Sequence, residues 1–138
     1  MSVPKNKRSQ GKLTVIVKAY HFASYTHEIC SNENVFLKRN RWCSTMKIVD
    51  TADDIAIYCE LANECDAKNE EGLKERKRLQ QLALQCSSKA EALMEIAYRD
   101  NNRKKQNLPD DKFEYWVGLL VELRTLIRKW RDSVKGNH

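Results

Sequence analysis

The residues whose types and spacing could do chemistry are few, and they lie in the first half of the chain. His27 and Cys30 are three residues apart and share a face of a helix, where a histidine can activate a thiol nucleophile. A hydrogen-bonded histidine beside a core cysteine is the alternative, and we favour it. Asp50, Asp53 and Asp54 form a patch of the oxygen ligands that a divalent cation prefers. No Glu-x-x-His motif of a di-iron bundle accompanies the patch, so we expect a solvated helix face and no metal.

The cysteines follow neither a metal-binding nor a disulfide pattern. Their number is odd, they lie within segments that favour helices, and neither a CxxC nor an HxxxH pair occurs. Because a free cysteine packs as a small apolar residue, we expect reduced cysteines that mostly fill the core. The five are Cys30, Cys43, Cys59, Cys65 and Cys86. With no catalytic constellation among these residues, we expect a protein that is not an enzyme and needs no cofactor.

Composition narrows the fold class. The chain has 138 residues, of which 41% are hydrophobic, and only 4 glycines and 2 prolines. So few turn formers disfavour β-sandwiches and barrels, and the absence of a glycine-rich phosphate loop disfavours nucleotide-binding α/β folds. No apolar run is long enough for a transmembrane helix, and no apolar signal region follows the basic N-terminus. We therefore expect one cytoplasmic domain without membrane contact.

The C-terminal segment contains the clearest helix. Its apolar residues are spaced alternately by three and four, which is typical of a helix that packs along its whole length. They are Phe113, Trp116, Leu120, Leu123, Ile127, Trp130 and Val134. Pro109 and the two aspartates after it suit a helix start, and cations crowd the other end, so we predict a helix over 109–134.

Three further helices are predicted by apolar stripes. Between Gly72 and Asn101 the stripe consists of Leu79, Leu82, Ala83, Cys86, Ala90, Leu93, Ile96 and Ala97. In a helix over 34–67 it consists of Trp42, Met46, Val49, Ala52, Ala56, Cys59 and Asn63. In a helix over 12–31 it consists of Ile16, Ala19, Tyr20, Ala23 and Cys30. Thr14 to Val17 could also form a strand, but no other segment offers a strand partner.

These four helices, joined by short links, bury their stripes most simply in an antiparallel up-down bundle. The sequence therefore predicts an all-α fold with a four-helix bundle domain over 12–135. Residues 1–11 are expected to form a disordered basic tail that precedes this domain.

Charge is distributed unevenly along the chain. Residues 1–49 carry 9 basic and 2 acidic side chains, residues 50–71 carry 1 and 8, and residues 72–138 carry 15 and 9. Clustered Lys and Arg side chains neutralise phosphates, so the basic clusters favour binding of a polyanion such as nucleic acid. Two alternatives stay open. The cations could belong to a solvated surface, paired with acids four residues away as in Glu70–Lys74, or the acidic segment could bind a basic protein or a neighbouring copy.

The order of residues follows a family pattern over residues 12–134. In the second half it is carried by Glu75-Arg76, Gln80, Ala83, Leu93, Ile96, Ala97, Lys112, Trp116 and Trp130-Arg131-Asp132-Ser133. In the first half it is carried by Leu13 to Tyr25, Lys38-Arg39-Asn40-Arg41-Trp42 and Ala62-Asn63. This pattern resembles a bacterial four-helix bundle family that includes the accessory variability proteins (Avd) of diversity-generating retroelements and the proteins encoded within ribosomal RNA intervening sequences. Trp116 and the Trp130 to Ser133 ending are more similar to the retroelement branch.

The resemblance implies a non-catalytic accessory subunit that assembles as a homopentamer. Such a subunit binds the retroelement's reverse transcriptase and its template-repeat RNA and supports mutagenic cDNA synthesis. The alternative is a protein-interaction module of the ribosomal RNA intervening-sequence type with no retroelement role. The basic positions that match the family are Arg39, Arg41, Arg76, Arg78, Arg128 and Arg131. With the other clustered cations, the candidates for contact with nucleic acid or polymerase are Arg39, Arg41, Arg76, Lys77, Arg78, Arg103, Lys104, Lys105, Arg124, Arg128, Lys129 and Arg131.

Overall fold

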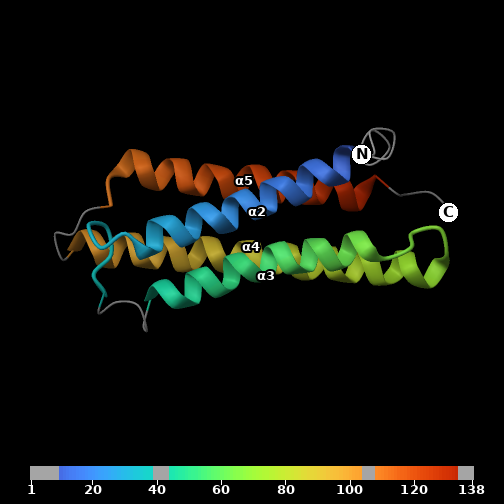
Figure 1. Cartoon of the computed structure of the whole chain (residues 1–138), viewed down its shortest axis with the longest axis horizontal. Helices are drawn as coiled ribbons and strands as arrows, with labels where there is room; N and C mark the ends of the chain where they lie inside the picture. Colours follow the sequence, from blue (N-terminus) through green and yellow to red (C-terminus); the bar gives the residue numbers. More distant parts are fainter. Residues whose placement is uncertain (1–9, 39–43, 104–107, 134–138) are drawn as a thin grey trace.

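Four helices form a bundle in this computed structural model, which describes residues 10–38, 44–103 and 108–133 (Figure 1). They are α2 (Gln10–Ser31), α3 (Met46–Glu64), α4 (Glu70–Arg103) and α5 (Asp110–Asp132). Within these ranges no strand occurs, which confirms the all-α fold class for this part of the chain. α2 begins inside the predicted tail, whose residues 1–9 lie outside the described residues. None of the described helices is long and apolar enough to cross a membrane.

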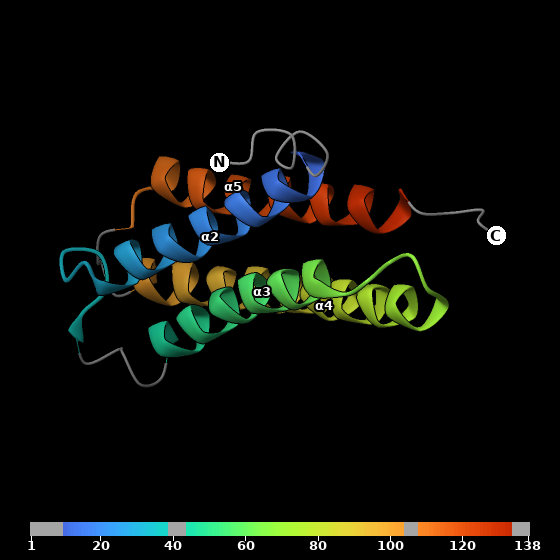
Figure 2. The same ribbon diagram turned by 45° about the vertical axis from the view of Figure 1, so that its right-hand side comes forward.

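Each helix packs against two neighbours. α3 and α5 both contact α2 and α4, which places α3 and α5 at diagonal corners of the bundle (Figures 1 and 2). Tyr20 of α2 donates a hydrogen bond to the Glu60 carboxylate of α3. Two turns later in α2, His27 Nε2 lies 2.8 Å from Asp53 Oδ1, and Asp53 comes two turns before Glu60 in α3. Later residues of α2 therefore meet earlier residues of α3.

The predicted heptad of α5 forms one side of the core. Its buried members are Trp116, Leu120, Leu123, Ile127 and Trp130, whereas Val134 lies outside the described residues. The Trp116 indole Nε1–H donates to Thr26 Oγ1 of α2 at 3.0 Å, so the large ring is buried without leaving its polar atom unpaired. The burial of these residues confirms the spacing prediction for α5. The acidic first turn and the basic last turn favour the same helix.

The predicted stripe of α4 is partly correct. Four of its eight residues are buried: Leu79, Ala83, Ala90 and Ala97. Leu82, Cys86 and Leu93 are only partly buried, and Ile96, expected in the core, is 63% exposed. The buried face also includes residues outside the predicted stripe, namely Arg76, Gln80, Leu84, Ser87, Met94 and Asn101. α4 lies between α3 and α5, and the alanines and Ser87 on this face allow the helices to approach closely.

The prediction of one helix over 34–67 is also wrong. α3 spans only Met46–Glu64. At the predicted start of the helix the backbone forms a turn instead, in which Asn32 Oδ1 accepts the Asn34 N–H at 2.9 Å. The Asn32 carbonyl accepts the N–H groups of Val35 and Phe36, and both of those side chains are buried. This loop therefore closes one end of the core. Trp42, expected at the start of the α3 stripe, lies outside the described residues.

A short loop connects α3 to α4 at the other end of the bundle. Asn69 Oδ1 accepts the Gly72 N–H at 2.6 Å, which caps the first turn of α4. Gly72 is required there, because an added Cβ would overlap the Asp66 carbonyl oxygen. The acidic residues Glu70 and Glu71 in the first turn suit the positive end of the helix dipole.

Arg76 holds this end of the bundle together. The side chain is 4% exposed, and its guanidinium donates to the carbonyls of Ala62 at 3.0 Å and Cys65 at 2.8 Å, where α3 ends. The same guanidinium lies over the Trp130 ring, 5.8 Å from the ring centroid. One residue of α4 therefore contacts both α3 and α5.

We expect Arg76→Leu to lower the free energy of unfolding by about 3 kcal/mol, since it removes the guanidinium donors of the Ala62 and Cys65 carbonyls and leaves the Ala62 carbonyl with only the Cys65 N–H. Arg76→Lys keeps the charge but not the planar fork, so its effect is expected to be intermediate. The measurement is urea unfolding followed by helical circular dichroism. Arg78→Leu, on the exposed side of α4, is the control and should leave the midpoint nearly unchanged. Equal midpoints for Arg76→Leu and Arg78→Leu would contradict the role assigned to Arg76.

Candidate nucleic-acid interface

Eight of the twelve candidate cations lie on the described parts of α4 and α5. Arg39, Arg41, Lys104 and Lys105 lie outside the described residues. The other eight are Arg76, Lys77, Arg78 and Arg103 on α4, and Arg124, Arg128, Lys129 and Arg131 on α5. The structure therefore places the described candidates on two helices that pack against each other.

Two of the eight point into the fold. Arg76 is buried against the end of α3, and burial lowers the pKa of its guanidinium. The Arg124 side chain is 15% exposed and donates to Ser87 Oγ at 3.0 Å and to Glu91 Oε1 at 2.6 Å. Their donors are used between helices, so the prediction that these two arginines contact a polyanion is not supported by their placement. They join α4 to α3 and α5 to α4.

Two more arginines, Arg78 and Arg103, are exposed but paired with a neighbouring carboxylate. Arg78 binds Glu75 through two hydrogen bonds, at 2.9 and 2.7 Å, which raise the pKa of Arg78 and lower that of Glu75. Arg103 lies 2.5 Å from an Asp100 oxygen. Exposed pairs of this kind are weak and exchange readily, so the pairing does not prevent contact with a phosphate.

Arg131 forms the polar contact between the end of α5 and the start of α4. Its Nη1 donates to Gln81 Oε1 at 3.0 Å, and its Nε to Asp132 Oδ1 at 3.1 Å. The first turns of α4 and the last turns of α5 therefore lie at one end of the bundle (Figure 1). This end carries Lys77, which is half-buried, and the exposed Arg78 beside the cations of α5.

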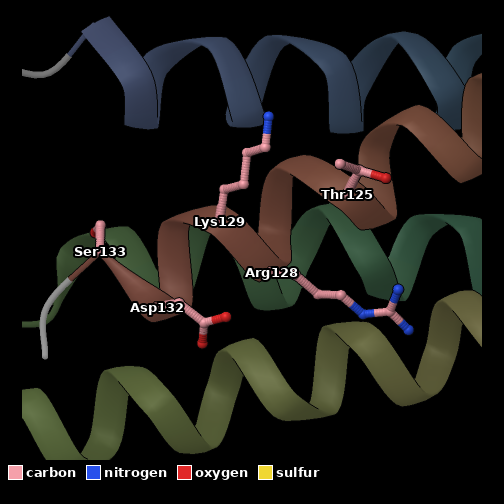
Figure 3. Close-up of a pocket in the computed structure, with 5 residues that line it drawn as sticks. All are labelled: Thr125, Arg128, Lys129, Asp132 and Ser133. Atoms are coloured by element: carbon pink, nitrogen blue, oxygen red, sulfur yellow. The ribbon is translucent and has the colours of Figure 1, made fainter.

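Arg128 and Lys129 are the most available cations among the described candidates. Both are exposed, and within the described part of the chain neither forms an ion pair. With Thr125, Asp132 and Ser133 they line a surface pocket of about 410 Å³. Figure 3 shows Lys129 reaching toward α2 and Arg128 leaving α5 on the opposite side, toward α4, so the two side chains can contact separate phosphates. We call these two residues the α5 cations.

The α4 side of this end is electrically mixed. Glu71, Lys74, Glu75 and Arg78 together line a second surface pocket, of about 450 Å³. Two acids next to two cations give a much weaker attraction for phosphate than unpaired cations do. The α5 cations are therefore the centre of the candidate interface.

The cysteine and histidine that could do chemistry are not arranged as a nucleophile and base. His27 Nε2 faces Asp53, with which it lies within hydrogen-bonding distance at 2.8 Å. Cys30 is buried, and burial raises the pKa of its thiol to about 12, so the thiolate is scarce at neutral pH. His27, Cys30 and Asp50 do line a common surface pocket of about 220 Å³. Among the described residues, no group of three metal-ligating side chains occurs.

Sequence reasoning missed the internal roles of Arg76 and Arg124, although their spacing carries a signal. Arg76 lies seven residues before Ala83, on the face of α4 that also holds Ala90 and Ala97. Arg124 lies four residues after Leu120 and three before Ile127, both core residues of α5. An arginine in line with core positions is buried or half-buried, and it then needs partners that belong to another helix.

Comparison with known proteins finds no match to this chain among protein-family models, curated proteins or solved structures. The family resemblance therefore rests on the residues of this sequence. The helical fold and the placement of the cations rest on the structure.

We expect the buried thiols to react at least about tenfold more slowly with iodoacetamide than Cys65 does near pH 8, because burial raises the pKa of Cys30 and of Cys59 to about 12. Cys65 is only partly buried, at the end of α3. Mass spectrometry of peptides after timed labelling measures each rate, and the unfolded protein provides the reference. Labelling of Cys30 as fast as Cys65 in the folded protein would show that the thiol is activated.

Proposed function

We propose that this chain is a non-catalytic, helical accessory protein that binds RNA through the end of its bundle where α4 begins and α5 ends. One observation carries this proposal: the α5 cations Arg128 and Lys129 are exposed and have no ion-pair partner among the described residues. Cations in this state can release counterions from a phosphate backbone when they bind it. The exposed Arg78 and the half-buried Arg131 add weaker contacts at the same end.

The family resemblance supports a more specific form of the proposal. In that form the chain is an antiparallel up-down bundle that assembles as a homopentamer and serves a diversity-generating retroelement, where it binds the reverse transcriptase and the template RNA. The contact of late α2 residues with early α3 residues supports the bundle topology. A reverse transcriptase gene and a pair of near-identical repeats beside the gene for this chain would support the retroelement role.

The second candidate function is a protein-interaction module of the ribosomal RNA intervening-sequence type that binds no nucleic acid. It is favoured by the use of most described candidate cations within the fold: Arg76 and Arg124 between helices, and Arg78, Arg103 and Arg131 with carboxylates. The α5 cations also suit the negative end of the helix dipole. RNA binding separates the two candidates.

We expect Arg128→Glu with Lys129→Glu to weaken binding of single-stranded RNA at least about tenfold and to reduce the salt slope of log K by about 1.4, the value for two lost phosphate contacts. The measurement is fluorescence anisotropy of a labelled RNA at several salt concentrations. The control is Lys47→Glu with Lys89→Glu, which makes the same change in net charge at two exposed positions on α3 and α4.

A slope near zero for the wild-type chain would remove the RNA-binding proposal. Equal losses in the two double variants would show that net charge, and not the α5 cations, determines binding. Retained binding by the control with a tenfold loss in the α5 variant is the outcome that supports the proposed interface.

The assembly has its own measurement. A homopentamer has five times the mass of the 16.2 kDa chain, and light scattering after size-exclusion chromatography distinguishes it from a monomer. We expect the larger mass at micromolar concentration. A stable monomer at that concentration would contradict the pentamer, while the RNA-binding proposal would still be decided by the salt slope.

A further inference from the structure

α3 has a face that no described helix covers. It packs against α2 and α4, and its inward residues are the core positions from Ile48 to Ala62. The residues on the other side recur at helical spacing and point to solvent. We call this the α3 outer face, made up of Asp50, Asp54, Ile57, Leu61 and Glu64.

Two adjacent turns of this face are apolar. Ile57 is 51% exposed and Leu61 is 42% exposed, and they lie four residues apart on α3. Exposed apolar side chains on α2, Val17 and Tyr20, lie nearby, since Tyr20 bonds to Glu60 of α3. Single exposed apolar residues are ordinary on protein surfaces, but a contiguous set on neighbouring helices marks a surface that can bury area against a partner.

Carboxylates border these apolar residues on the same face. Asp50, Asp54 and Glu64 are exposed, and within the described part of the chain none of them forms an ion pair. Lys47, near the start of α3, is the one basic residue in the helix. The face therefore combines apolar area with unpaired negative charge, which is the complement of a helix with an apolar stripe bordered by lysine or arginine.

The chemistry of the face excludes the two other occupants that the chain suggests. A nucleic acid would meet only like charge on this face. A second copy would have to offer a stripe of apolar side chains next to cations. Near the α5 cations, however, the exposed large apolar residue on the same face is, among the described residues, the single Val121, and the pocket there is lined by Thr125, Asp132 and Ser133 besides the cations. The exposed Ile96 of α4 does not match the α3 outer face either, because the Glu95–Arg99 pair beside it is already neutralised.

We propose that the α3 outer face binds a cationic amphipathic helix of a partner protein, with Ile57 and Leu61 against its apolar stripe and Asp50, Asp54 and Glu64 against its flanking lysines or arginines. This inference uses charge of the opposite sign from the RNA-binding proposal and does not depend on it. It gives the chain two separate surfaces, one for a polyanion and one for a basic protein segment.

The test uses the full chain and a labelled synthetic peptide of roughly five helical turns, with leucines along one face and lysines on both sides of it. Fluorescence anisotropy measures binding. We expect Ile57→Ser with Leu61→Ser, and separately Asp54→Lys with Glu64→Lys, to weaken binding at least about tenfold. The control is Ile96→Ser, which removes an equally exposed apolar side chain from α4 and should change affinity less than about twofold. Circular dichroism checks that each variant keeps its helices, and the charge variant alters only exposed positions.

Three outcomes would overturn the proposal. In the first, a scrambled peptide of the same composition binds as tightly as the amphipathic one. In the second, the face variants and the Ile96→Ser control lose affinity equally. In the third, light scattering of the chain alone shows an assembly that Ile57→Ser with Leu61→Ser dissociates, which would identify a second copy as the occupant. RNA affinity of Ile57→Ser with Leu61→Ser, which leaves the net charge unchanged, should stay at the wild-type value, so failure here is distinguishable from failure of RNA binding.

Discussion

The structure depends on how the last carbonyl groups of α3 are satisfied. A helix ends with carbonyls that have no partner within it, and a buried helix end needs donors from elsewhere. Here the Ala62 carbonyl accepts the Cys65 N–H, and Arg76 supplies the side-chain donors. Its guanidinium reaches the carbonyls of Ala62 and Cys65 and lies over the ring of Trp130. A buried charge is tolerated only where its donors are used, so Arg76 fixes the position of α4 against both α3 and α5.

Sequence patterning predicted the buried face of a helix best where that face consists only of large apolar residues. α5 met this condition, because its heptad of large apolar residues coincides with its buried face. α4 did not, because its inner face mixes Leu79, Leu84 and Met94 with alanine, serine and polar side chains, and Ile96 points to solvent. The loop after Asn32 was missed for another reason. Its buried Val35 and Phe36 look like helix positions in the sequence, and only tertiary packing against Trp116 reveals that they close the core from a loop.

The sequence predicted that the candidate interface would be basic, but it did not predict which cationic side chains would be exposed there. Clusters of arginine and lysine show that a chain is locally basic, yet an arginine becomes a surface or an internal residue according to partners on other helices. Arg124 is internal because Ser87 and Glu91 of the neighbouring helix α4 accept its hydrogen bonds, although both residues are far away in the sequence. Arg128, four residues later, faces outward and keeps its charge available. Charge clustering does not separate the two, since both lie in the same basic end of one helix, and only the spacing of Arg124 from the core residues Leu120 and Ile127 hints at the difference.

The separation of the two charged surfaces follows from the same packing. α3 and α5 lie at diagonal corners of the bundle, so the α3 outer face and the α5 cations point in different directions. Because both contacts are local and exposed charges are screened over about 10 Å at moderate salt, a ligand on one surface changes the potential at the other only slightly. Their responses to salt also differ in kind. Phosphate binding weakens steeply with salt through counterion release, whereas a helix docked on Ile57 and Leu61 keeps the part of its affinity that comes from apolar burial. If both proposals hold, a bundle with these two surfaces binds a polyanion and a basic protein segment independently of each other.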